Sequence, residues 1–178
     1  MGQIGQDNKV KLFCGIIYGD EKIKAQAFEK LIQKFGEIDL ESPTIPFDYT
    51  SYYNAEMGSN LKRMWISFKN LIFSGGLADI KIFTNDVEQS FADNSNRTIN
   101  IDPGYISAAN VVLATTKDYS HRIYLDKGIY GEITTIYKKP QGFIKLPWSY
   151  PDYMSETARN FLLKARGIFL EDLRLAVR

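Results

Sequence analysis

The sequence predicts a single α+β domain, built as a two-layer sandwich around a ferredoxin-like βαββαβ core. Two observations indicate this fold. An apolar strand followed by an amphipathic helix occurs twice in succession. Further strand-like runs around a glycine-containing turn then predict an added β-hairpin, and one more amphipathic helix ends the chain. A mixed sheet of different topology would fit the same elements, so the sequence leaves that alternative open.

The first strand–helix unit has clear boundaries. Residues 10–18 form an apolar run between Lys9 and Gly19, which predicts a buried strand. Asp20 is typical of a helix N-cap, and Gly36 is typical of a glycine that ends a helix. The residues between them carry an apolar stripe at helical spacing, formed by Ala25, Phe28, Leu31, Ile32 and Phe35.

The second unit begins less regularly. Two prolines interrupt residues 38–49, so we expect an edge or broken strand there, because proline cannot donate to a β-ladder. Alternation predicts a strand over residues 62–72, and apolar residues at helical spacing predict a helix over residues 77–91. A short strand is expected over residues 97–101, ended by an Asp-Pro-Gly turn at residues 102–104.

The remaining chain extends this core. Residues 111–115 are apolar and β-rich, and residues 121–125 and 129–137 flank an Asp-Lys-Gly turn that predicts a hairpin. Residues 140–151 read as an aromatic, proline-broken connection. Ser155 is the expected N-cap of the last helix.

The composition is that of an ordinary folded domain. The chain has 178 residues, of which 44% are hydrophobic and 24% are charged. We expect a flexible tail over residues 1–9 and one domain over residues 10–178. The net charge of +1 gives no general field for nucleic acid or an anionic membrane. A single cysteine excludes an intrachain disulfide, and no signal-like N-terminus or apolar run of about 20 residues occurs, so a cytoplasmic location is expected.

A candidate site lies between residues 100 and 132, where polar side chains interrupt apolar runs. Such groups are costly to bury unless they are paired or used. Lys117 and Arg122 suit a phosphate or a carboxylate, and His121 and Glu132 are the candidates for proton transfer. The ligand-binding candidates in this region are Asn100, Asp102, Tyr105, Lys117 and Arg122. The alternative interpretation is a salt-bridged rim of the sheet with no ligand.

The aromatic segment PFDYTSYYNAEMG could add a second wall to this site. It contributes Asp48, Tyr52, Tyr53 and Glu56 as further ligand-binding candidates. Tyrosine combines apolar area with a hydroxyl that seeks a partner, which suits a ligand-facing wall. The alternative is an aromatic corner that packs a loop onto the sheet.

Strand geometry limits the site. Neighbouring residues on a strand point to opposite faces, so His121 and Arg122 cannot both face one site unless the ladder is bulged or His121 lies in the loop before the strand. Asp102, Asp118 and Glu132 could hold Mg²⁺, and no cofactor is otherwise indicated. No dedicated metal site is predicted, since the chain has one histidine and one cysteine, and no GxxxxGK[ST] phosphate loop occurs.

Several segments together resemble a known family. They include VKLFCGIIYGDE, ESPTIPFDYTSYYNAEMG, LKRMWISFKNLI, NIDPGYISAANVVLATTKDYSHRIYL and LPWSYPDY. The chain resembles the uncharacterised bacterial and archaeal domain-of-unknown-function family 4416 over about residues 10–174, most specifically in DPGY and TTKDYSHRIYL. The resemblance implies one domain, and it implies no established substrate and no established catalytic residues.

Two functions remain. The first is binding of a small phosphorylated or carboxylated ligand, such as a nucleotide, with catalysis undecided. The second is a non-catalytic module that binds protein or RNA through Trp148, Tyr150 and Tyr153. The near-neutral charge speaks against nucleic acid, no membrane partner is indicated, and the oligomeric state is left open.

Overall fold

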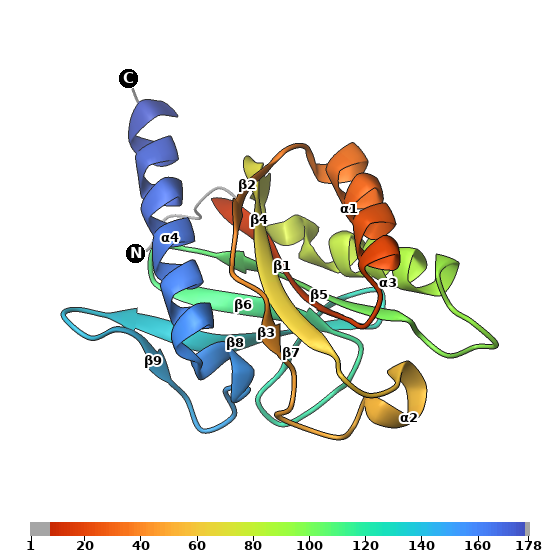
Figure 1. Cartoon of the computed structure of the whole chain (residues 1–178). Coiled ribbons are helices and arrows are strands. Elements are labelled where there is room, and N and C mark those ends of the chain that lie inside the picture. The colour runs from red at the N-terminus through yellow and green to blue at the C-terminus, as the bar shows by residue number, and fades with distance from the viewer. Residues whose placement is uncertain (1–7, 177–178) are drawn as a thin grey trace.

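The computed structural model describes residues 8–176 and confirms the α+β class (Figure 1). Most of the predicted N-terminal tail, residues 1–7, lies outside the described residues, and Lys9 already belongs to the first strand. The elements are β1 (Lys9–Tyr18), α1 (Glu21–Phe35), β2 (Ile38–Glu41), β3 (Ile45–Pro46), α2 (Asn54–Met57), β4 (Lys62–Phe73), η1 (Ser74–Gly76), α3 (Leu77–Ser90), β5 (Ile99–Ile106), β6 (Asn110–Thr115), β7 (Ile123–Asp126), β8 (Ile129–Lys138), β9 (Gly142–Lys145), η2 (Asp152–Met154) and α4 (Glu156–Ala176).

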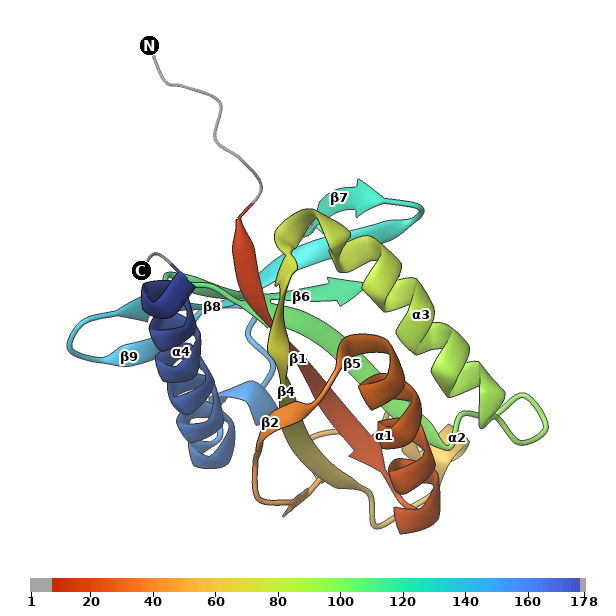
Figure 2. The ribbon, with the colours of Figure 1, turned by 90° about the horizontal axis from the view of Figure 1, so that it is seen from above.

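The first half of the chain forms the predicted ferredoxin-like core. Its strands run side by side in the order β2-β4-β1-β5, and every neighbouring pair is antiparallel. In chain order these are the second, third, first and fourth strands of a βαββαβ unit. The helices α1 and α3 pack on one face of this sheet (Figure 2). Asp20 caps α1 as expected, since its side chain accepts from the backbone N–H of Lys22.

The second half widens the sheet and adds a layer that the sequence did not predict. Strands β6, β8 and β7 continue the sheet beyond β5, and β9 pairs with β8 inside the connection predicted to be irregular. The helix α4 covers the face opposite α1 and α3, so the two-layer core becomes a partial three-layer structure (Figure 1). The fully buried Lys11 of β1 links α4 to the sheet, because it forms ion pairs with Asp39 of β2 and Asp172 of α4.

The strand β1 is buried on both faces because it lies between these helical layers. Its even-numbered side chains, such as Leu12 and Ile16, join the core under α1 and α3. Its odd-numbered Phe13 joins the core under α4. A strand covered on both faces has no solvent side, which explains why its sequence is apolar instead of alternating. The structure describes no helix long and apolar enough to cross a membrane.

The predicted turn at residues 102–104 is wrong, because β5 continues through it to Ile106. Proline is rare inside sheets, since it lacks the N–H that a ladder needs. The N–H and carbonyl of Ile101 bond to side chains of α3, so they point away from β1. Backbone groups two residues apart point to the same side, so the nitrogen of Pro103 also points away from β1. The proline therefore removes no hydrogen bond from the β1–β5 ladder.

We predict that Gly104→Ala lowers the free energy of unfolding by roughly 1–3 kcal/mol, because overpacking forces the backbone to shift. An added Cβ would lie 2.4 Å from the carbonyl oxygen of Val112 and 2.8 Å from the ring of Phe13. Urea unfolding and the melting temperature measure the effect, at about 2–4 °C per kcal/mol for a chain of this size.

The matched control is Gly167→Ala, on the exposed side of α4, where an added Cβ meets no atom within 4 Å. Alanine favours a helix over glycine by about 1 kcal/mol, so this variant should melt at a higher temperature than the parent. Equal melting temperatures for the two variants would contradict the close approach of β5 and β6 at Gly104.

Candidate functional site

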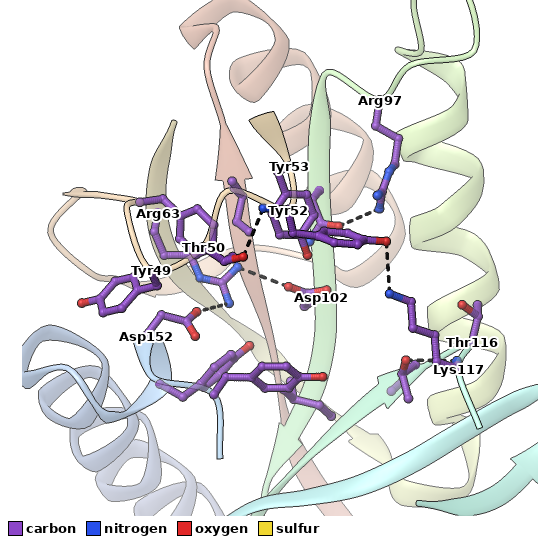
Figure 3. Close-up of a pocket in the computed structure, with 18 of the residues that line it drawn as sticks. Tyr49, Thr50, Tyr52, Tyr53, Arg63, Arg97, Asp102, Thr116, Lys117 and Asp152 are labelled. Atoms are coloured by element: carbon purple, nitrogen blue, oxygen red, sulfur yellow. Dashed lines mark hydrogen bonds and ion pairs between the residues drawn. The ribbon is translucent and has the colours of Figure 1, made fainter. Parts of the chain in front are cut away.

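The sheet opens between β5 and β6, and the candidate site lies in this opening. The strand β5 pairs with β1 from Ile99 to Ile106, but it pairs with β6 only from Gly104 to Ile106. Beyond Leu113, β6 stays paired with β8 alone. A cavity of about 700 Å³ fills the space where the two strands separate (Figure 3).

Side chains of α3 make hydrogen bonds to backbone groups of β5 that have no strand partner in this opening. The N–H of Ile101 donates to Oε1 of Glu88 at 2.6 Å, and the carbonyl of Ile101 accepts from Nζ of Lys81 at 3.1 Å. Both side chains are buried and lie seven residues apart, on one face of α3. Two polar side chains of α3 therefore take the place of a neighbouring strand, and the sheet can stay open without unpaired backbone groups at Ile101.

The wall of the cavity is largely aromatic. Six aromatic side chains line it, contributed by the segment before β4 and by the segment before α4. They are Phe47, Tyr49, Tyr52, Tyr53, Tyr150 and Tyr153. Tyr52 is 60% exposed, whereas Tyr153 is 1% exposed and packs against α4. Burial raises the pKa of Tyr53 well above its ordinary value, so this hydroxyl stays neutral.

A buried arginine forms one side of the cavity floor. Arg63 of β4 is 1% exposed, and its guanidinium lies 3.3 Å from Asp102 and 3.0 Å from Asp152 (Figure 3). To reach Asp102 on β5 it crosses β1 at Gly15, where a Cβ would lie 2.7 Å from Nη2 of Arg63. Gly15 therefore leaves the room that this ion pair needs.

The charges around Arg63 shift one another's protonation equilibria. Burial acts to lower the pKa of Arg63, but its acidic and tyrosine neighbours, Asp152 foremost, raise it above its ordinary value. Burial also raises the pKa of Asp152, against the opposing effect of Arg63. The guanidinium additionally lies over the rings of Trp65 and Tyr153, at 4.9 and 5.2 Å from their centroids.

A second arginine fastens the aromatic segment to the sheet. Arg97 forms a bidentate pair with Glu56, with both N–O distances at 2.7 Å. This hydrogen-bonded pair lowers the pKa of Glu56. Nη1 of Arg97 also donates to Oδ1 of Asn100 at 2.9 Å. Glu56, predicted as a ligand-binding residue, is therefore occupied by Arg97 and does not line the cavity.

His121 and Arg122 form a cluster behind the cavity. Both lie in the turn before β7, which confirms the alternative that placed His121 outside the strand. Nε2 of His121 and Nε of Arg122 lie 3.2 and 2.7 Å from Oε2 of Glu132. Arg122 also donates to the hydroxyl of Tyr150 at 2.9 Å. Glu132 and Tyr150 line the cavity, whereas His121 and Arg122 support them from behind.

The structure thus brings together about half of the predicted site residues. Lining the cavity are Asn100, Asp102, Lys117, Glu132, Tyr52 and Tyr53. Tyr105 is not among them, because it packs on the opposite face of β5 with the core under α3. Asp48 is exposed and also lies outside the lining.

Five charged lining residues were not predicted. They are Arg63, Lys81, Glu88, Arg97 and Asp152. A sequence signal existed for Lys81 and Glu88, because their spacing places two charges on the apolar face of a predicted helix. Arg63 likewise interrupts an apolar strand. Such charges inside apolar patterns indicate buried ion pairs, but the sequence does not show where their partners lie.

Magnesium binding by Asp102, Asp118 and Glu132 together finds no support. Within residues 8–176, no group of three or more histidine, cysteine, aspartate or glutamate side chains could hold a metal ion. Asp102 is paired with Arg63, and Glu132 is occupied by the cluster behind the cavity.

Glu88 makes the stability of this site depend on pH. Burial raises its pKa from 4.5 to about 7, although Lys81 opposes the shift. The folded protein therefore holds a proton on Glu88 that the unfolded chain releases between these pH values. That proton stabilises the fold at acid pH, and the contribution is lost as the pH rises through 7.

We predict that Glu88→Gln, which keeps an acceptor for Ile101 without the charge, removes this pH dependence. Between pH 5 and pH 8 the parent should lose on the order of 1–3 kcal/mol of stability relative to the variant. Urea unfolding of both proteins at the two pH values measures the difference. A difference that stays constant with pH would contradict the raised pKa.

Comparison with known proteins identifies the family of this chain, which the geometry of the cavity alone does not. No curated protein and no solved structure matched the chain. The family model described as a domain of unknown function, DUF4416, matches residues 8–169. This match spans β1 through most of α4, and therefore includes the whole cavity. The chain belongs to the DUF4416 family.

Proposed function

We propose that this domain binds a small phosphorylated or carboxylated ligand in the cavity between β5 and β6. The cavity volume of about 700 Å³ lies within the range of roughly 300–1,000 Å³ that is usual for small-molecule sites. Its wall combines aromatic area with a few convergent polar groups, as such sites do.

The proposal rests on the ammonium group of Lys117, which lines the cavity without a carboxylate partner among the described residues. Four cationic side chains line the cavity: Arg63, Lys81, Arg97 and Lys117. The two arginines are held by carboxylates, and Lys81 is held by the carbonyl of Ile101. Lys117 is exposed, and its ammonium group contacts the hydroxyl of Tyr52 at 3.2 Å and the ring of the same tyrosine (Figure 3). A neutral hydroxyl leaves its charge available to an anion.

The charge balance favours a single anionic group at the rim. Four carboxylates also line the cavity, namely Glu88, Asp102, Glu132 and Asp152. All four contact the arginines or the cluster behind the cavity, and those that are ionised would repel an anion placed among them. The anion is therefore expected beside Lys117 and the hydroxyls of Thr115 and Thr116, away from the floor.

We predict that phosphorylated or carboxylated compounds raise the melting temperature, and that Lys117→Ala removes the effect. A ligand at about 100 times its Kd should add about 2.7 kcal/mol of stability. The loss of a charge-assisted hydrogen bond should weaken binding by roughly tenfold or more. The measurement is thermal unfolding against nucleotides, sugar phosphates and dicarboxylates, with and without Mg²⁺, followed by titration calorimetry.

The matched control is Lys69→Ala, which removes an exposed lysine paired with Glu37 and outside the cavity lining. This variant should bind as the parent does. A panel that shifts no melting temperature, or a shift that survives in Lys117→Ala, would contradict the proposal.

A second candidate function is a non-catalytic protein-interaction module. The edge strand β7 exposes Ile123 at 70% and Tyr124 at 57%, and an exposed apolar edge can pair with another strand. The aromatic side chains that the sequence suggested as an interaction surface, Trp148, Tyr150 and Tyr153, give this function less support. Trp148 and Tyr150 are about 40% exposed, but Tyr153 is buried under α4.

Edge pairing between copies predicts a mass that increases with concentration in sedimentation equilibrium. Ile123→Lys places a charge on this edge and should return the protein to a monomer. If the parent protein is monomeric at all concentrations, pairing of β7 between two copies of the chain is contradicted.

A further inference from the structure

Asn100 has a buried donor without an acceptor. The side chain lines the cavity and is 3% exposed, and its Oδ1 accepts from Arg97. A guanidinium can only donate, so this bond fixes which end of the amide is oxygen. Among the described residues, the remaining Nδ2 has no hydrogen-bond partner. A buried donor left unpaired costs free energy, and a ligand acceptor that reached Nδ2 would recover it. Nδ2 is closed to solvent in this structure, so the side chains beside it must move to admit that acceptor.

Asp102 offers the complementary acceptor. It lies two residues from Asn100 on β5, so both side chains occupy the same face of the strand. Its ion pair with Arg63 engages Oδ2, and its side chain keeps 29% of its surface exposed. A group with an acceptor next to an N–H donor would therefore be matched by these two side chains. The carboxylates of Asp102 and Asp152 also disfavour an anion at this depth.

Aromatic rings are available to cover such a group. Tyr49, Tyr52 and Tyr150 line the cavity and keep 39%, 60% and 40% of their surfaces exposed. Nucleic-acid bases stack on aromatic side chains whatever the base, because every base has a π-face. A planar heterocycle would use these ring faces, whereas a sugar phosphate or a dicarboxylate would not.

We propose that the cavity binds a nucleoside phosphate whose base has a carbonyl beside a ring N–H, as in uracil and hypoxanthine. Nδ2 of Asn100 donates to the carbonyl, and Asp102 accepts from the ring N–H. The base lies among the tyrosines, and the phosphate lies at the rim beside Lys117. This inference rests on the proposed function, because it specifies the ligand of the same cavity.

Titration calorimetry with the monophosphates of uridine, inosine, adenosine and cytidine tests this recognition. Adenine and cytosine do not have a carbonyl next to a ring N–H. The parent should bind uridine or inosine monophosphate at least about tenfold more tightly than the other two, since 1.4 kcal/mol corresponds to tenfold in Kd. A short uridine oligonucleotide is tested alongside them. If it binds more tightly than uridine monophosphate, the same base recognition holds and the ligand is the end of an RNA chain instead of a free nucleotide.

The decisive variant is Asn100→Asp, which replaces the donor with a carboxylate while retaining an acceptor for Arg97. It should weaken binding of uridine or inosine monophosphate by about tenfold and leave binding of a sugar phosphate unchanged. Asn110→Asp makes the same chemical change outside the cavity lining and should alter neither. Circular dichroism melting confirms that each variant is folded.

The outcomes separate the two proposals. Equal binding of all four monophosphates, with loss in Lys117→Ala, would overturn base recognition and leave anion binding intact. Preference for uridine or inosine monophosphate that survives in Asn100→Asp would also overturn the role of this amide. Absence of binding to every anion would overturn both.

Discussion

The open sheet depends on the hydrogen bonds that α3 makes to Ile101. A strand that loses its neighbour exposes backbone N–H and carbonyl groups, and burying them unpaired would cost several kcal/mol. Glu88 and Lys81 supply one acceptor and one donor at this point, so β5 and β6 can separate without that cost. Pro103 has the same orientation and lacks an N–H, which removes a second donor from the opening. The separation therefore follows from particular side chains, and it creates the cavity.

The floor of the cavity follows from a second local constraint. Arg63 starts on β4 and pairs with Asp102 on β5, so it must cross β1, and the absence of a side chain at Gly15 permits this. The buried charge is then balanced by Asp102 and Asp152. Because its deep charges are already paired, the ligand that we propose would be selected by the rim, the rings and the unpaired amide of the cavity instead of by a strong overall field.

The sequence predicted the fold better than it predicted the site. Helical and strand periodicity report burial directly, so α1, α3, α4 and the ferredoxin-like strand order were accessible from it. The Asp-Pro-Gly segment of β5 was mistaken for a turn, because a proline inside a sheet is permitted by the absence of a neighbour, and that absence is a tertiary property. Asn100, Asp102 and Lys117 were predicted as site residues and do line one cavity. Arg63 and Arg97 were missed because their roles depend on partners from distant strands.

An NMR titration of the ¹⁵N-labelled protein tests most directly whether the opening between β5 and β6 binds a ligand. Uridine monophosphate is added and the shifts of backbone amides are followed. The structure predicts that shifts concentrate in three segments around the cavity: residues 49–53, 99–102 and 114–117. Shifts concentrated on β7, or spread evenly over the surface, would contradict a site in this opening.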